Sequence, residues 1–216
     1  PVKTSNKKTD MFQAISWALF VIISLWMLIH ITVDLVKGKI SFKKTGEHHR
    51  FWWCGWRKEL TLFSKLKRIA GIVAVVCLIV MLFTAFTGRL VSDQLMTGYV
   101  LMIHVGTAPV FIISLLFLIV SWGYQCRLTD LEWKEFLGRL KFKSTNTKNS
   151  LLTIKLTFWL AMVLSVPVSL SMLASMFTIF GTHGQEVLFS IHQYTSLALV
   201  SSAFIHLYLL LRYQYK

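Results

Sequence analysis

The sequence predicts an all-α integral membrane protein, a five-transmembrane-helix bundle that forms one membrane domain over residues 1–216. Hydrophobic residues make up 55% of the chain, charged residues 15%, and the mean hydropathy is +0.62, unlike an ordinary soluble domain of this size. Five stretches are also long and apolar enough to cross a bilayer of about 30 Å as helices. They are residues 12–36, 66–88, 99–123, 154–180 and 187–211.

Basic residues are concentrated in two of the four connections between these stretches. Residues 37–65 hold eight Lys or Arg and residues 124–153 hold six, whereas the other two connections hold one between them. Because positively charged loops stay in the cytoplasm, this asymmetry predicts an outside N-terminus and a cytoplasmic C-terminus. Lys3, Lys7 and Lys8 favour the opposite orientation but are outnumbered. The net charge of +14 therefore indicates topology and contact with lipid headgroups, and no nucleic-acid motif accompanies it.

One basic connection contains a predicted amphipathic helix over about residues 129–142. Thr129 and Glu132 have the spacing of a capping box. The apolar residues that follow share one helical stripe, and Lys134, Glu135 and Arg139 lie off it. That stripe consists of Trp133, Phe136, Leu137 and Leu140. We expect this helix to lie along the cytoplasmic interface of the membrane.

Four histidines within the apolar stretches form two pairs at matching membrane depth. His192 and His206 are fourteen residues apart, close to four turns of helix, so they project from nearly one face about 21 Å apart. With alternating helix directions, His104 falls at the depth of His192 and His30 at the depth of His206. A lone membrane histidine is often only a packed polar residue, but two depth-matched pairs indicate metal ligation.

Two imidazoles at each depth are typical of a six-coordinate haem that carries electrons. Zinc would require further close ligands, and no carboxylate or thiol cluster accompanies these histidines. Cys54, Cys77 and Cys126 form no CxxCH motif, so covalent c-type attachment is excluded. The sequence therefore predicts two haem b groups, one ligated by His104 and His192 and the other by His30 and His206.

Residues 65–211 resemble the membrane dihaem cytochrome b subunits of bacterial formate dehydrogenases, nickel-iron hydrogenases and thiosulfate reductases. The resemblance rests on Phe86-Thr87-Gly88, on the run GYVLMIH ending at His104, on the basic stretch 130–142, and on the two histidines of the last helix. It implies a multi-pass protein of the bacterial inner membrane that exchanges electrons between a quinone, menaquinone or ubiquinone, and a redox partner. That partner would be a multihaem cytochrome c or an iron-sulfur subunit. The family usually carries a histidine near the start of the helix that ends in Thr-Gly, and residues 67–71 have none, so His30 would supply the missing ligand.

Other polar residues acquire roles that depend on the haems. Haem propionates need cations, and the candidates are Arg89, Lys37, Lys155 and Arg212, with snorkelling to headgroups as the alternative. Quinone chemistry moves protons, and the candidate groups are Asp34, His48 and His49, with a solvated interfacial position as the alternative.

The expected function is electron relay across the membrane between the quinone pool and a redox partner subunit. A six-coordinate iron carries electrons and leaves no position for substrate, so any catalysis would lie at a quinone site. Two other classes remain open. A proton-coupled transporter could use buried histidines as relays, but it would be expected to carry intramembrane acids. A non-redox membrane anchor of a peripheral complex would need no histidines.

Overall fold

The chain folds into helices throughout the part that the computed structural model describes, which comprises residues 2–38, 62–91, 96–141 and 150–214. Its elements are α1 (Val2–Val36), α2 (Leu62–Val91), α3 (Gly98–Trp122), α4 (Asp130–Leu140), α5 (Ser150–Ser175), the 3₁₀ turn η1 (Thr178–Phe180) and α6 (Gly181–Gln214). All of them except α4 and η1 are long and apolar enough to span a membrane. The predicted helical membrane bundle is thus confirmed at the level of its helices.

The helix ends differ from the sequence prediction, most of all in α1, α5 and α6. The predicted helix 154–180 stops at Ser175, and η1 follows it before α6 begins at Gly181. Gly181 has a φ of +60°, a left-handed conformation that favours glycine, so the chain turns there. α1 begins at Val2 rather than near residue 12, because a helix can continue beyond the apolar stretch that crosses the bilayer.

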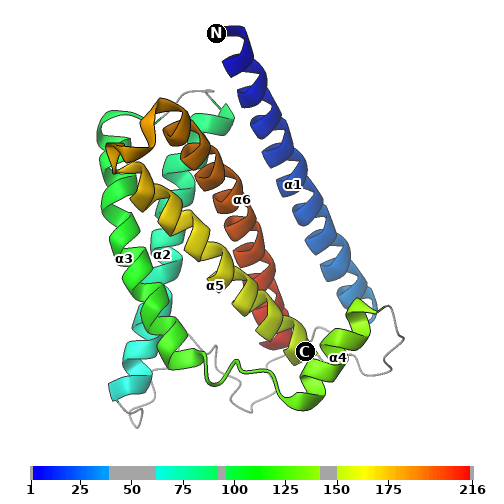
Figure 1. Cartoon of the computed structure of the whole chain (residues 1–216). Coiled ribbons are helices and arrows are strands. Elements are labelled where there is room, and N and C mark those ends of the chain that lie inside the picture. The colour runs from blue at the N-terminus through cyan, green and yellow to red at the C-terminus, as the bar shows by residue number, and fades with distance from the viewer. Residues whose placement is uncertain (1, 39–61, 92–95, 142–149, 215–216) are drawn as a thin grey trace.

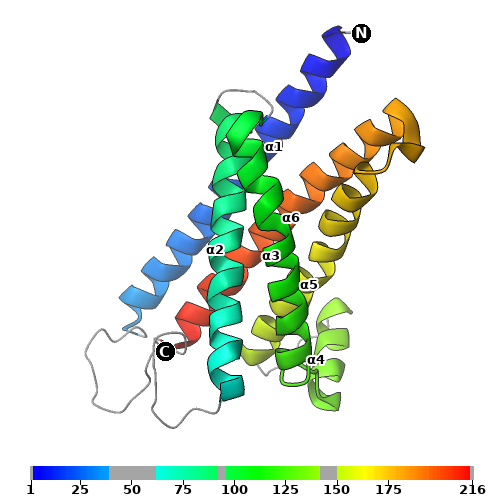
Figure 2. The same cartoon turned by 90° about the vertical axis from the view of Figure 1, so that its left-hand side faces the viewer.

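Two antiparallel hairpins, α2–α3 and α5–α6, make up most of the bundle (Figures 1 and 2). The backbones lie close together within each hairpin and approach only sparsely between the hairpins. α1 runs beside α6 and in the same direction (Figure 1). Only 6% of its most apolar window is buried, against 33% for α6, so most of α1 is left to face lipid.

Apolar side chains fill the middle of the space between the hairpins and much of the half toward α4. We call this group the central cluster; it consists of Ala74, Cys77, Phe111, Leu118, Phe158, Met162, Val168 and Leu199. A second, smaller group joins α1 to α2 and α6 through Phe12, Phe86, Leu197 and Val200. Edge-to-face ring pairs, such as Phe12 with Tyr194 and Phe20 with Phe204, continue the contact between α1 and α6.

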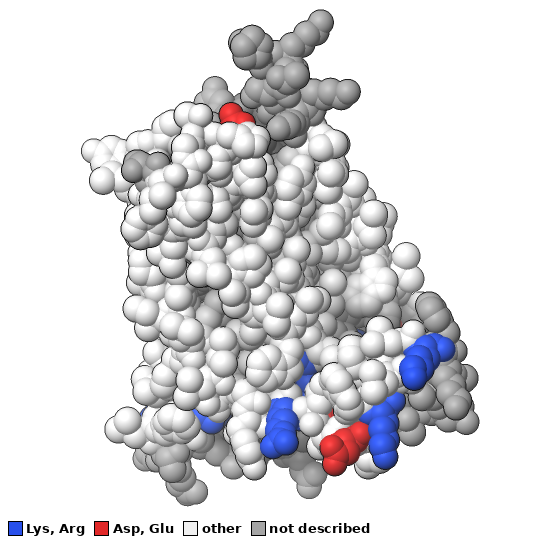
Figure 3. Space-filling model, in the orientation of Figure 1, with Lys and Arg blue, Asp and Glu red and all other residues white. Residues whose placement is uncertain are grey.

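One end of the bundle, which we call the basic end, holds α4 and the C-terminal end of α6 (Figures 1 and 3). Every Lys and Arg whose side chain is described lies there, at the nearby termini of the long helices or in and beside α4. They are Lys37, Lys65, Lys67, Arg68, Arg127, Lys134, Arg139, Lys141, Lys155 and Arg212. The far end holds the start of α3 and the start of α6 (Figure 1).

The amphipathic helix and its capping box are confirmed. The Thr129 hydroxyl accepts from the Glu132 backbone N–H at 3.4 Å, and the Glu132 carboxylate accepts from the Thr129 N–H at 2.8 Å. The polar side of α4 faces the bundle: Lys155 of α5 donates to both Glu132 oxygens at 2.8 Å, and Glu135 is buried in an ion pair with Arg139. The apolar stripe, including Trp133 and Leu137, is exposed, as expected of an interfacial helix.

Candidate functional site

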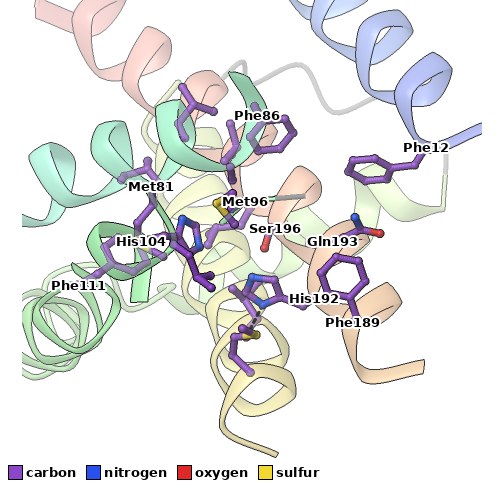
Figure 4. Close-up of a pocket in the computed structure, with 18 residues that line it drawn as sticks. Phe12, Met81, Phe86, Met96, His104, Phe111, Phe189, His192, Gln193 and Ser196 are labelled. Carbon is purple, nitrogen blue, oxygen red and sulfur yellow. Dashed lines mark hydrogen bonds between the residues drawn. The ribbon is translucent and has the colours of Figure 1, made fainter. Parts of the chain in front are cut away.

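His104 and His192 come together in the far half of the bundle, one from each hairpin. His104 lies on the second turn of α3, and His192 lies on α6 at the same depth. Their ring centroids are 6.5 Å apart and the ring planes are nearly perpendicular, at 82° (Figure 4). The structure therefore brings together the pair of histidines that the sequence predicts at this depth.

The hydrogen bond of His192 fixes which ring nitrogen carries the proton. Its Nδ1 lies 3.1 Å from the backbone carbonyl of Val168 in α5. A carbonyl can only accept, so Nδ1 is the donor and carries the hydrogen. The lone pair of the neutral ring is consequently on Nε2, which is the form that ligates a metal.

His104 is held in the same way by a threonine of α2. The Thr84 hydroxyl lies 2.9 Å from His104 Nδ1. Its single proton is already directed to the backbone carbonyls of Val80 and Met81, at 2.8 and 3.1 Å. With that proton on a carbonyl, the hydroxyl oxygen accepts from Nδ1–H, which again leaves the lone pair on Nε2. Metal-bound histidines in proteins are oriented by this kind of second hydrogen bond.

A cavity of about 250 Å³ opens beside the two rings (Figure 4). Phe111, Val168 and Leu199 of the central cluster form its floor, and Phe12 of α1 forms part of its wall. Its lining is otherwise mostly apolar, with Gln193 and Ser196 as polar exceptions. Because the cavity is only partly enclosed, a flat macrocycle larger than its volume can extend past its rim.

The spacing of the rings fits a metal ion between them. When two imidazoles bind one metal ion, each metal–nitrogen bond is about 2 Å long and each ring nitrogen lies about 1 Å from its ring centroid. The two centroids are then roughly 6 Å apart. Among the described residues, no third His, Cys, Asp or Glu joins the pair to complete the shell of a bare ion. A tetrapyrrole supplies the four remaining nitrogens itself, so the donor set suits a haem better than zinc.

At the basic end, His30 and His206 are not brought together. His206 Nδ1 lies 2.9 Å from the Thr157 hydroxyl of α5, and its ring packs against Phe158. His30 Nδ1 lies 3.0 Å from the phenolic oxygen of Tyr208, which is two residues beyond His206. His206 thus points from α6 toward α5, whereas His30 contacts α6 on the side of Tyr208.

Asp34 and Arg212 form an ion pair between α1 and α6. Arg212 Nε donates to Asp34 Oδ2 at 2.5 Å and Nη2 donates to Oδ1 at 3.1 Å. Asp34 is only 3% exposed, so the alternative interpretation of this residue as solvated at the interface is wrong. The pair accounts for both a predicted quinone-site residue and a predicted propionate cation.

The remaining predicted residues are spread over the molecule. Lys155 is engaged by Glu132 and by the backbone carbonyl of Arg127, at 2.8 and 3.1 Å. Lys37 is exposed after the end of α1. The side chain of Arg89 and the residues His48 and His49 lie outside the described part of the chain.

Sequence reasoning missed the groups that orient the histidines. Thr84, Thr157 and the Val168 carbonyl belong to helices that carry no histidine among the described residues. Threonines at matching depth on the partner helices were the available signal, because a buried imidazole Nδ1–H in a membrane needs an acceptor. The backbone carbonyl left no signal in the sequence at all.

Comparisons with protein-family models, curated proteins and solved structures give no match.

Proposed function

We propose that this chain is a membrane cytochrome b subunit that holds a b-type haem between His104 and His192. In this role it exchanges electrons between a quinone, menaquinone or ubiquinone, and a redox partner, either a multihaem cytochrome c or an iron-sulfur subunit. One observation carries the proposal: two histidines from separate hairpins face each other with both Nδ1 atoms bonded to acceptors. The resemblance of residues 65–211 to dihaem cytochrome b subunits supports the same chemistry.

A haem between two imidazoles supplies one-electron transfer without an open coordination position. The chain's own residues would hold and insulate it. Thr84 and the Val168 carbonyl orient the two rings. Phe12, Phe111 and Leu199 surround the cavity with apolar atoms and keep water away. Gln193 and Ser196 are the polar side chains of that wall and could donate to an oxygen of the macrocycle.

The charge distribution supports an orientation for this function. All Lys and Arg with described side chains lie at the basic end, which by the positive-inside rule would be cytoplasmic. The His104–His192 site would then lie toward the outer surface of the inner membrane, with the N-terminus outside.

The alternative functions have less support. The described intramembrane acid, Asp34, is neutralised by Arg212 rather than placed in the cavity, which is unlike a proton-coupled substrate site. A membrane anchor without a redox role would not need two histidines at one cavity. It would also not need both Nδ1 atoms to be hydrogen-bonded to neighbouring helices.

The test is to purify the full chain from cells that supply haem. We expect a red protein with a reduced-minus-oxidised b-type spectrum and the electron paramagnetic resonance signal of a bis-imidazole low-spin iron. His104→Ala and His192→Ala should abolish both signals, whereas His183→Ala, at an exposed position of the same helix as His192, should change neither. Colourless protein, or haem retained after either substitution, would refute the proposal. Reduction of the haem by a quinol analogue in liposomes tests the electron donor separately.

A further inference from the structure

We infer that the described helices hold one haem, in the far half of the bundle, and that His30 and His206 are not a second pair of ligands. The inference rests on the proposed function and limits it. It changes the expected cofactor number and the sides from which electrons can arrive.

The first reason is the geometry of α6. Residues two apart on an α-helix point about 200° away from each other. Tyr208 points toward α1, because its hydroxyl bonds to His30, and Arg212, one turn further on, also meets α1 through Asp34. His206 therefore points to the opposite side, toward Thr157 of α5. A ring of α1 cannot face His206 unless α1 moves around the helix.

The second reason is that His30 belongs to a different set of contacts. Its ring packs on Trp26 at 5.2 Å and meets the Tyr208 ring edge to face at 6.0 Å. Its Nδ1 lies 4.0 Å from Asp34 Oδ2, the oxygen that also accepts from Arg212. His30 is thus one member of a polar group that joins α1 to α6. Its presence in the membrane helix is explained by these contacts without a role as a metal ligand.

The third reason is the packing beside His206. Phe158 of the central cluster lies against the His206 ring, with centroids 6.2 Å apart. Around it, Leu118 of α3 and Met162 of α5 are at most 7% exposed. A macrocycle on the α5 side of His206 would have to displace these packed side chains, whereas His104 and His192 already border a cavity.

A single centre has a functional consequence. The ligand positions 192 and 206 are about 21 Å apart along α6, so a haem at His192 alone does not reach across a bilayer of about 30 Å. Quinone and redox partner would both have to meet the protein in its far half. Transmembrane relay would then need a further redox centre from another subunit.

Haem stoichiometry tests the inference directly on the full chain. Pyridine haemochromogen absorbance divided by protein from amino-acid analysis should give one haem per chain, and a redox titration should show a single one-electron wave. His206→Gln and His30→Gln should keep the full haem content, while His104→Ala removes all of it. Two haems per chain, two waves, or loss of half the haem in either glutamine variant would overturn the inference.

The outcomes separate this inference from the proposed function. Protein without haem refutes both. Two haems, with one lost in His104→Ala, refute the inference and leave the cytochrome proposal intact. If a glutamine variant does not fold, the stoichiometry and the titration of the unaltered chain still decide between one centre and two.

Discussion

At the residue scale, the site depends on hydroxyl and carbonyl groups as much as on histidines. Thr84 and Thr157 each accept an imidazole Nδ1–H while donating their own proton to their helix backbone. In a bilayer no water satisfies these ring nitrogens, so each histidine needs a fixed acceptor on a neighbouring helix. The acceptor sets the tautomer, and the tautomer decides whether Nε2 can bind a metal.

Thr84→Val removes the acceptor of His104 at nearly constant volume. We expect haem affinity to fall about 10- to 100-fold, the usual effect of losing a hydrogen bond that orients a metal ligand. Thr87→Val, three residues further along α2, is the matched control because the Thr87 hydroxyl donates to the Phe83 carbonyl of its own helix and, among the described residues, bonds to no histidine. Haem titration into the apoprotein measures both, and equal affinity in the two variants would contradict the assignment.

The sequence was sufficient to select His104 and His192 because helix direction and residue count fix depth. It could not predict which side of α6 each partner helix occupies. The same depth argument therefore paired His30 with His206. In the structure His206 points from α6 toward α5, whereas His30 contacts the opposite side of α6 at Tyr208.

At the element scale, α1 is joined to the bundle by few contacts, and the Asp34–Arg212 ion pair is one of them. Breaking a buried pair by removing one partner leaves an uncompensated charge. The free-energy cost of leaving such a charge unpaired opposes the separation of α1 from α6.

Asp34→Asn should weaken the docking of α1 by roughly 3 kcal/mol, because Arg212 loses its countercharge. Cross-linking by a bismaleimide of cysteines substituted for Phe20 and Phe204, whose ring centroids are 6.3 Å apart, reports this docking. The cross-linking rate should drop in Asp34→Asn and recover in the double variant Asp34→Arg with Arg212→Asp. An unchanged rate in Asp34→Asn would show that apolar contacts alone hold α1.

The attachment of α4 should depend on pH through Glu132. The hydrogen bond from Lys155 lowers the pKa of this carboxyl below its ordinary value of 4.5. A lowered pKa means that the contact stabilises the folded form above pH 4.5 and is lost as the pH falls through the lower, folded-state value.

A spin label at Lys134→Cys should therefore stay immobile until the pH falls below 4.5, then become mobile. In Lys155→Gln the mobility change should move to higher pH. Asp130→Asn, which alters a carboxyl in the same turn of α4, serves as the control. A transition at the same pH in all three proteins would exclude the Lys155 contact as the cause.

Sequence patterns predicted α4 well because a capping box is local: the donor and acceptor are three residues apart. They placed the ends of α1 and α6 poorly, because these helices continue into polar residues that hydropathy does not recognise. They also could not show that Glu135 is buried, since its burial depends on how α4 meets the bundle.

At the scale of the whole molecule, the charge distribution predicts the orientation. A single cysteine at Glu186, at the far end, should react with an impermeant maleimide added outside intact cells. A single cysteine at Lys141, at the basic end, should react only after the membrane is opened. The reverse pattern would place the His104–His192 site on the cytoplasmic side.

Haem binding should also change how the bundle unfolds. The two hairpins have few close backbone approaches, and a ligand held by His104 and His192 would tie one hairpin to the other. Ligand present at 100 times its dissociation constant stabilises a protein by about 2.7 kcal/mol. The unaltered chain should therefore melt higher with haem than without it in detergent, while His192→Ala melts at one temperature in both conditions.

The position of Phe12 links two parts of the molecule that are distant in sequence. This side chain stands on the sparsely packed α1 and forms a wall of the cavity beside His104 and His192. Separation of α1 from α6 would remove Phe12 from this wall and change the surroundings of any haem bound in the cavity. If a haem occupies this cavity as proposed, its absorption spectrum would therefore report whether α1 is packed against α6.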